Sequence, residues 1–156
     1  MTDPHTPAIA AAETLGLDHE VRVIERARSV EEAAERIGIP VDVLCKTLVV
    51  RRAEGEYLLV LVPGSRQLDW AKLRAHLGVS RLSLPDAEEA RDATGYERGT
   101  ITPLGIVRPL PVVVDAQAAG ADRSAIGGGA HGVSLLVAPA DLVAAVGAEV
   151  ADVTKA

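Results

Sequence analysis

The chain has 156 residues and a mass of 16.2 kDa, which is enough for one compact domain and leaves no room for a second catalytic domain. It is 48% hydrophobic and 24% charged, so it can bury a core and is not typical of a disordered chain. The formal net charge of −6 excludes uniform attraction to nucleic acid or an anionic membrane, so any phosphate contact requires a local basic patch.

The rare residue types exclude further classes of protein and of binding site. The single cysteine, Cys45, excludes an internal disulfide and a cysteine-rich zinc site, and it fits a reducing compartment. The first ten residues lack the basic and apolar stretches of a secretion signal, and no apolar run is long enough to span a membrane, so we expect a cytoplasmic protein. With no Phe, one Trp and two Tyr, stacking of several bases on an aromatic platform is unavailable.

Capping residues and hydrophobic periodicity predict alternating helices and strands in the first half of the chain. The predicted helices cover residues 6–15, from Ser29 to near Gly38, and 70–77 after the cap Asp69. The predicted strands cover residues 19–25, 43–51 and 57–63, and Pro40 opens a short turn or helix. The last two strands flank a Glu-Gly-Glu turn and are almost continuously apolar, which indicates a hairpin in a sheet covered on both faces.

The second half begins with a helix capped by Asp86 and is then interrupted. Residues 94–111, TGYERGTITPLGIVRPLP, contain three glycines and three prolines, which is typical of a functional loop. The remaining predicted elements are strands at 112–115 and 133–137, a glycine turn at 127–129 and a helix at 139–146. This order predicts an α/β or α+β domain with a mixed, largely antiparallel sheet flanked by helices.

Lys46 is conspicuous because arginines outnumber lysines thirteen to three and because it lies in an apolar run. On a strand it shares a face with Leu48 and Val50. Its amine either reaches solvent or meets an anionic group in a cavity, and the sequence leaves both readings open.

Two glycine-containing segments could present backbone amides. Segment 99–105, GTITPLG, suits either the recognition of a substrate carbonyl or a purely structural turn. Glycines at 127, 129 and 132 fit the spacing of a dinucleotide fingerprint, but a predicted strand rather than a helix follows them. A tight turn between strands is favoured over dinucleotide binding, and an oxidoreductase is a remote alternative.

The sequence offers few side chains that could act as metal ligands or nucleophiles. The four histidines are scattered without metal-ligand spacing, no GxSxG motif occurs, and Cys45 lies among apolar residues that favour a core position. His131, between glycines, is the histidine best placed to reach a site, although a solvated loop position is also open. We expect no metal, no cofactor and no strong side-chain nucleophile.

Three segments together carry a resemblance. The strand CKTLVV, the stretch TGYERGTITPLG followed by LPVVVD, and the turn GGGAHG leading to APADL resemble the YbaK/prolyl-tRNA-synthetase-associated family of aminoacyl-tRNA deacylases. The order and spacing agree from the N-terminal helix to a final strand near Val150. The resemblance implies one editing domain over residues 1–156 that hydrolyses the ester of mischarged aminoacyl-tRNA, with tRNA for proline as the expected carrier.

The resemblance also implies roles for particular residues. The GxxxP loop holds the aminoacyl group through its amides, Lys46 meets the terminal adenosine or its phosphate, and a hydroxyl of the terminal ribose or a substrate thiol assists the attack. The expected catalytic residues are Lys46, Gly99, Thr100, Ile101, Thr102 and Pro103. The expected substrate-binding residues are Lys46, Thr47, Gly105, Gly128, Gly129, His131 and Ser134. The 3′ CCA end of tRNA and prolyl-tRNA synthetase are the expected partners.

The chain departs from the family pattern in ways that affect specificity. Thr100 replaces a second glycine, Ala130 and His131 replace a basic pair, and Ser134 replaces an aspartate near the substrate amine. The cysteinyl specificity of the YbaK branch is therefore not carried over, and alanyl, seryl and threonyl substrates remain open. A catalytically silent module that binds the tRNA 3′ end, a nucleotide or a synthetase is the alternative. Arg51, Arg52, Arg66 and Arg74 are candidates for a basic side of the molecule together with Lys46.

Overall fold

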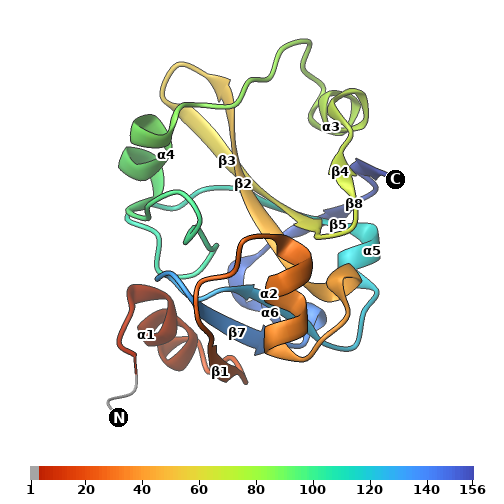
Figure 1. Ribbon diagram of the computed structural model, residues 1–156. Coiled ribbons are helices and arrows are strands. Elements are labelled where there is room, and N and C mark those ends of the chain that lie inside the picture. The colour runs from red at the N-terminus through yellow and green to blue at the C-terminus, as the bar shows by residue number, and fades with distance from the viewer. Residues whose placement is uncertain (1–3) are drawn as a thin grey trace.

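The computed structural model describes residues 4–156, so the first three residues of the N-terminal segment analysed above lie outside it. The helices are α1 (Pro7–Thr14), α2 (Val30–Ile37), α3 (Trp70–Leu77), α4 (Ala87–Thr94), α5 (Ala116–Ala119) and α6 (Pro139–Val146), with a 3-10 turn η1 at Val41–Val43. The strands are β1 (Glu20–Val23), β2 (Cys45–Ala53), β3 (Glu56–Pro63), β4 (Gln67–Leu68), β5 (Val112–Asp115), β6 (Ser124–Gly127), β7 (Val133–Val137), β8 (Glu149–Ala151) and β9 (Thr154–Lys155). Figure 1 shows their arrangement.

The strands form three sheets in the described part of the chain, with orders β1-β7-β6, β2-β3-β5-β8 and β4-β9. The pairs β3/β5 and β5/β8 are parallel and the other strand pairs are antiparallel, which confirms a mixed, largely antiparallel α/β domain. A single β-bridge between Leu44 and Ala125 joins the first two sheets beside β2. The strands therefore divide into separate sheets, where the sequence predicted one.

The helices begin and end where the capping signals predicted. The side chains of Ser29, Asp69 and Asp86 each accept a hydrogen bond from the backbone N–H three residues on, at 3.1, 3.2 and 2.8 Å. Gly38 and Gly78 end α2 and α3 in the left-handed conformation, which glycine adopts without steric cost. These local signals fix five helix ends without reference to the rest of the fold.

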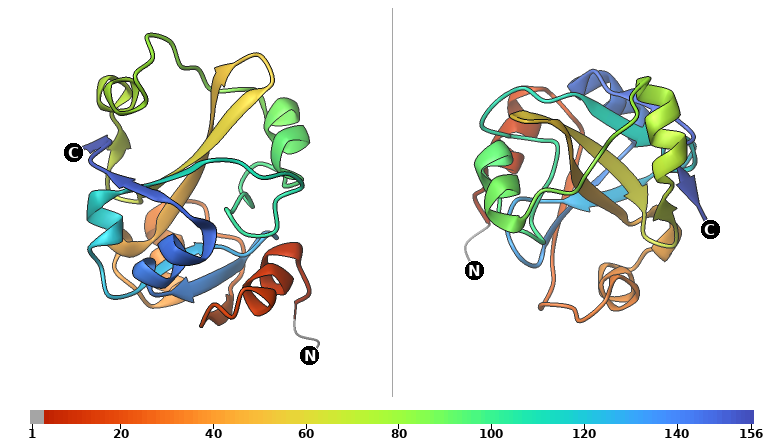
Figure 2. Two further views of the ribbon diagram at one scale, coloured as in Figure 1. Left: turned by 180° about the vertical axis from the view of Figure 1, so that it is seen from behind. Right: turned by 90° about the horizontal axis from the view of Figure 1, so that it is seen from above.

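The hairpin of β2 and β3 separates two parts of the core. Leu59 and Leu61 belong to the cluster that also contains residues of α1, β7 and α6, whereas Leu58, Val60 and Val62 belong to the cluster beneath α3. These five side chains are at most 2% exposed, which confirms that the hairpin is covered on both faces. In Figure 2 the hairpin crosses the middle of the molecule, and the two termini lie on opposite sides.

Four elements have no strong sequence signal: β4, α5, β6 and β9. Each has two to four residues, which is too short for hydrophobic periodicity to develop. The positions of β4 and β9 depend on each other across the length of the chain, and β6 pairs with the strand that follows it, β7. Within residues 4–156, no helix has the length and apolar character that a membrane span needs.

The segment between α4 and β5 contains no regular element, as predicted. It is nevertheless tightly held: the Tyr96 hydroxyl donates to the Leu104 carbonyl at 2.6 Å, and burial raises the pKa of Tyr96 to about 12. Gly105 has a positive φ of 70°, and a side chain there would collide with the Pro7 carbonyl of α1. The loop is therefore anchored against the N-terminal helix.

Candidate functional site

A cavity of about 630 Å³ lies where four distant segments meet. The connection from β1 to α2 forms one wall, the start of β2 a second, loop 98–101 a third and the turn between β6 and β7 a fourth. The bridge between Leu44 and Ala125 brings β2 next to β6, and pairing of β6 with β7 places the glycine turn at the cavity. The sheet topology, rather than any one motif, creates this site.

The charges that line the cavity have one sign. Twenty residues line it, and among them Arg26, Arg28, Lys46 and Arg98 are the formally charged side chains. The carboxylate of Glu97 lies close by, 3.8 Å from the imidazole of His131, and both side chains are exposed. In a protein with a net charge of −6, this concentration of cations favours an anionic ligand.

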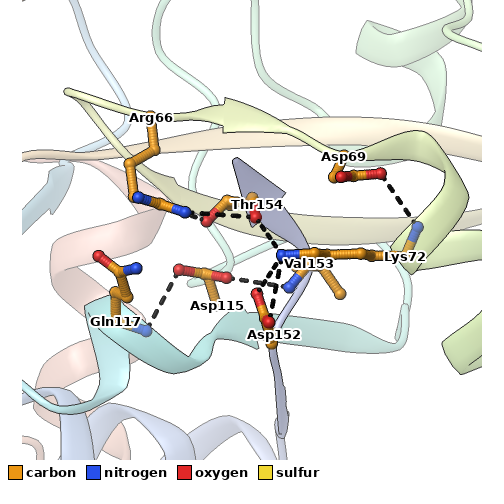
Figure 3. Close-up of polar contacts among 8 residues, drawn as sticks. All are labelled: Arg66, Asp69, Lys72, Asp115, Gln117, Asp152, Val153 and Thr154. Atoms are coloured by element: carbon orange, nitrogen blue, oxygen red, sulfur yellow. Dashed lines mark hydrogen bonds and ion pairs between the residues drawn. The ribbon is translucent and has the colours of Figure 1, made fainter. Parts of the chain in front are cut away.

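Lys46 lines the cavity and is half-buried. Its Nζ donates to the backbone carbonyl of Arg66 at 3.2 Å. Arg66 is fixed in turn, because its Nε donates to the Thr154 Oγ1 at 2.7 Å (Figure 3). An ammonium carries three donors, so two remain for a ligand. Of the two readings that the sequence left open for Lys46, this geometry favours the amine in a cavity.

Loop 99–103 divides its residues between the cavity wall and the core. Gly99 and Ile101 line the cavity, and within residues 4–156 their N–H groups donate to no protein acceptor. The N–H of Thr100 is already used, since it donates to the Glu97 carbonyl at 2.9 Å. Gly99 has a φ of 90°, which favours glycine at that position. Two neighbouring amides are thus free to stabilise negative charge on a carbonyl oxygen.

Several predicted site residues lie behind the wall rather than in it. Thr100, Thr102 and Pro103 are buried, and the Thr100 hydroxyl donates to the Glu97 carbonyl. The Thr102 hydroxyl is buried with no partner in the described part of the chain. Gly105 packs on α1. These residues shape the loop and do not line the cavity.

In the turn between β6 and β7, too, some residues line the cavity and others pack behind it. Gly128 donates its N–H to the Val133 carbonyl at 2.9 Å, and a side chain at Gly129 would contact Tyr96 and α1. Neither residue lines the cavity, whereas Gly127, His131 and Ser134 do. A strand follows the glycines, so the reading as a tight turn between strands is confirmed and the dinucleotide fingerprint is not formed.

Four polar side chains line the cavity besides the cations: Ser29, which caps α2, and Thr47, His131 and Ser134. The His131 ring lies beside Gly99, where a Cβ would come within 3.3 Å of its Cε1. Ser134 is opposite Gly127 in the β6/β7 pair. The Thr47 hydroxyl is buried without a hydrogen-bond partner among residues 4–156 and lines the same cavity, so it is available to a ligand.

Cys45 also lines the cavity, but it is a poor nucleophile. It is 7% exposed, and burial raises the pKa of its thiol to about 11. The thiolate is therefore disfavoured at neutral pH. No group of three or more histidine, cysteine or acidic side chains within residues 4–156 is arranged to hold a metal ion.

Arg26, Arg28 and Arg98 line the cavity but were not predicted from the sequence. The first two belong to the run ERARS between β1 and α2, and Arg98 directly precedes Gly99, so basic residues next to the expected loop were the available signal. The predicted basic side of the molecule is divided instead. Arg51, Arg52 and Arg74 line a different hollow from Lys46.

A mixed α/β domain with a cationic cavity and two free loop amides is suited to an anionic ligand bearing a carbonyl group. The chain belongs to the aminoacyl-tRNA editing domain family, whose pattern it matches over residues 24–145. This match includes the β2 strand, the loop and the glycine turn that form the cavity, and it confirms the resemblance drawn from the sequence.

Individual relatives are of two kinds. A proline--tRNA ligase of Thermosipho melanesiensis is 32% identical over 67% of this chain, which corresponds to 19% of the ligase. The "Putative Cys-tRNA(Pro)/Cys-tRNA(Cys) deacylase EbsC" of Enterococcus faecalis is 25% identical over 88% of this chain and 84% of its own length. The chain spans about 14% to 20% of the curated proline--tRNA ligases that it matches.

A solved structure agrees over almost the whole chain. The crystal structure of "a putative trans-editing enzyme for prolyl tRNA synthetase" has a TM-score of 0.87 and 30% sequence identity, and covers 99% of this chain and 100% of its own. "Hypothetical protein APE2540" has a TM-score of 0.88 and 29% identity. The fold therefore also occurs as a small separate chain.

Proposed function

We propose that this protein is a free-standing deacylase that hydrolyses the ester of mischarged aminoacyl-tRNA. The observation that carries the proposal is the cavity in which only cations are formally charged and in which the N–H groups of Gly99 and Ile101 are free. A phosphorylated 3′ end would meet the cations, and the ester carbonyl would meet the amides. Family membership and a separate-chain homologue with deacylase in its name support this assignment.

The proposed reaction needs no side-chain nucleophile. A water molecule attacks the ester carbonyl, assisted by a neighbouring hydroxyl of the terminal ribose. The carbonyl oxygen becomes an oxyanion that accepts from the Gly99 and Ile101 amides. The bond from the carbonyl carbon to the ribose oxygen then breaks, and that oxygen takes the proton released by the water. The products are the free amino acid and tRNA with an intact 3′ end.

Binding roles follow from the positions of the other residues. Lys46 offers two donors to the terminal adenosine or its phosphate, and Thr47, His131 and Ser134 offer polar contacts inside the cavity. Thr100, Thr102, Pro103 and Gly105 hold the loop in shape, and Gly128 and Gly129 hold the turn, so these six residues act by positioning.

The amino-acid preference is set by a cavity whose lining includes small apolar groups such as Ala33 and Ala130. Ser134 supplies no negative charge to the substrate amine, and we propose alanyl, seryl or threonyl esters on tRNA for proline as substrates. A synthetase pocket separates side chains that differ by one methylene by only about 1–3 kcal/mol, so a separate hydrolytic site improves accuracy. We further propose that residues 1–156 act as one editing domain, in the cytoplasm, with prolyl-tRNA synthetase as a partner.

The test is a panel of tRNA for proline charged with alanine, serine, threonine or cysteine and incubated with the protein. We expect release of at least one of the first three amino acids, and we expect K46A to lower kcat/KM about 100-fold without a change in Tm. K155A, which alters an exposed lysine outside the cavity, is the matched control. Saturable tRNA binding with no release from any ester would identify a silent binding module instead.

A further inference from the structure

The carbonyl that accepts from Lys46 belongs to a short turn near the start of β2. Residues 63–66 lead from β3 into β4, and the Arg66 N–H closes this turn by donating to the Pro63 carbonyl at 3.0 Å. The register of the hairpin places Lys46 opposite Val62, one residue before the turn. The turn therefore begins next to the part of β2 that lines the cavity.

The turn is pinned to the backbone in front of β2. The Gly64 N–H donates to the Leu44 carbonyl at 2.7 Å. A Cβ on Gly64 would come within 2.9 Å of the carbonyl oxygens of Val41 and Leu44, and within 2.8 Å of Val30, which lines the cavity. These distances leave no space for a side chain, so glycine is required for the close approach. The turn thus packs against the cavity wall from behind.

The side chain of Arg66 is held by β9, the last strand of the chain. Its Nε donates to the Thr154 Oγ1 at 2.7 Å and its Nη2 donates to the Thr154 carbonyl at 3.3 Å (Figure 3). Thr154 is fully buried, pairs with Leu68 of β4, and accepts at its carbonyl from the Lys72 ammonium at 2.8 Å. Two hydrogen bonds to one fixed residue restrict the guanidinium, because its donors lie in a rigid plane.

These contacts form a continuous path from the last strand to the cavity. Thr154 holds the Arg66 side chain, and the Arg66 carbonyl accepts from the Lys46 Nζ at 3.2 Å. Thr154 lies outside residues 24–145, which the family pattern covers, and neither Arg66 nor Thr154 lines the cavity. Any effect of these two residues on a ligand therefore has to pass through Lys46 or the wall beside it.

The bond to Arg66 restricts the half-buried Lys46 side chain. A lysine has a long, flexible stem, and an ammonium in solvent samples many orientations. One donated hydrogen bond selects an orientation and leaves the other donors for a ligand. Restriction before binding raises affinity, because less side-chain entropy is lost when the ligand arrives.

We propose that Arg66 and Thr154 are positioning residues, which hold the Lys46 ammonium in the orientation that meets the 3′ end of tRNA. This inference rests on the proposed function, since that function supplies the ligand. Neither residue touches the ligand, so both act through Lys46. The competing interpretation is purely structural, with the two bonds serving only to hold β9 on β4.

The first test observes Lys46 in the free protein and needs no ligand. The NMR order parameter of its Cε methylene reports how strongly the end of the side chain is restricted. We expect T154V and R66M, which remove one and both of the bonds between the two residues, to lower this order parameter. T154S keeps the hydroxyl and should match the wild type. An unchanged order parameter in T154V and R66M would overturn the proposal.

D152N is the matched control. Asp152 is an exposed residue of the same C-terminal segment and pairs with Lys72 at 3.0 Å rather than with Arg66, so D152N should keep the wild-type order parameter. Because T154V replaces a fully buried hydroxyl, R66M provides a second route to the same bonds from a half-buried position. R66M decides the question if T154V does not fold.

The second test is a double-mutant cycle with Lys46, measured by deacylation. T154V should raise KM about fivefold and leave kcat within about twofold of the wild type, because one hydrogen bond behind the ammonium is lost and the reacting atoms are untouched. T154S should restore KM. In a K46A background T154V should have no further effect, since residues that act through one group are not additive. A fivefold rise in both backgrounds would overturn the proposal and establish the purely structural role.

Failure of the wild type to release any amino acid would count against the proposed function and not against this inference. The same cycle is then measured as the Kd for an uncharged transcript of tRNA for proline. A Kd about fivefold weaker in T154V, with no such difference in the K46A background, would support the positioning role. Equal Kd values for T154V and the wild type would overturn it.

Discussion

Two regions of the molecule use charged side chains in opposite ways: a paired end at the C-terminal strands and an open end at the cavity. Near the C-terminal strands, Lys72 binds the Asp152 carboxylate at 3.0 Å and the Thr154 carbonyl at 2.8 Å, and Asp115 accepts from the Val153 N–H at 3.0 Å (Figure 3). In the cavity, the side chains of Arg26 and Arg98 make no hydrogen bond or ion pair within residues 4–156.

This contrast separates residues that stabilise the fold from residues that are free to bind. A buried charge without a partner is strongly unfavourable, so Asp115, which is fully buried, has to be matched by donors. The cavity arginines are exposed to water and need no partner for stability. Unpaired charges of one sign around a hollow therefore indicate ligand binding more strongly than paired charges do.

The largest expected effect is at the paired end. Replacing Asp115 by alanine leaves the buried Val153 N–H without an acceptor and removes the bond from the Gln117 N–H. Hydrogen bonds to a charged group contribute about 1.5–3 kcal/mol each, so D115A should lower the free energy of unfolding by about 3 kcal/mol.

Urea denaturation measures this loss. D115N, which keeps one acceptor oxygen, should lose clearly less than D115A. Equal stability of D115A and the wild type would show that the paired end does not hold the fold.

A smaller effect is expected from Cys45, which lies between the two regions. Because burial raises the pKa of its thiol to about 11, the folded state disfavours the thiolate relative to the unfolded chain. The resulting stabilisation is fully present below pH 9 and is lost as the pH rises through 11. The free energy of unfolding has fallen by about 2 kcal/mol when the pH reaches 11. The free energy of unfolding should therefore fall more steeply between pH 9 and 11 in the wild type than in C45A. Parallel curves would contradict the burial argument.

The smallest effect is expected at the open end. R98Q should leave the free energy of unfolding within about 0.5 kcal/mol of the wild type, since exposed substitutions away from packed features are nearly neutral. It should raise KM for deacylation about tenfold, because Arg98 lines the cavity that we propose binds the tRNA 3′ end.

R108Q is the matched control for R98Q. Arg108 belongs to the same long loop, but its guanidinium lies 5.3 Å from the centre of the Tyr57 ring, outside the cavity. Steady-state kinetics should show KM unchanged in R108Q. A stability loss in R98Q with unchanged KM would reverse the distinction between the two ends.

Much of this fold could be predicted from the sequence, because its signals are local. A cap such as Ser29 and a terminal glycine such as Gly38 determine helix ends within one turn of chain. The continuous apolar run of β3 indicated burial on both faces. The short strands β4 and β9 could not be found, since Gln67 pairs with Lys155 across 88 positions and neither strand has a pattern of its own.

The residues of the cavity could be predicted only in part, because only some of them have a local signal in the sequence. Lys46 and Gly99 stand out by residue type and motif, and the structure brings both to one cavity. Thr102 and Gly129 were expected in the site on the same motifs, but Thr102 is buried and the backbone of Gly129 packs against Tyr96 and α1, so neither lines the cavity. Arg26 could not be assigned to the cavity from the sequence, because its position depends on the pairing of β1 with β7, more than 100 residues later in the chain.

Helix α1 precedes the region that the family pattern covers, but it supports the glycine turn beside the cavity. The Thr6 hydroxyl caps α1 and donates to the Gly128 carbonyl at 2.7 Å, across 122 positions of sequence. Residues 4–23 precede the matched region, yet they buttress the glycine turn from behind. Proteolytic trimming of this helix, or a bulky fusion attached to it, would thus perturb the proposed catalysis from a distance, because it would remove support from the glycine turn without touching any residue that lines the cavity.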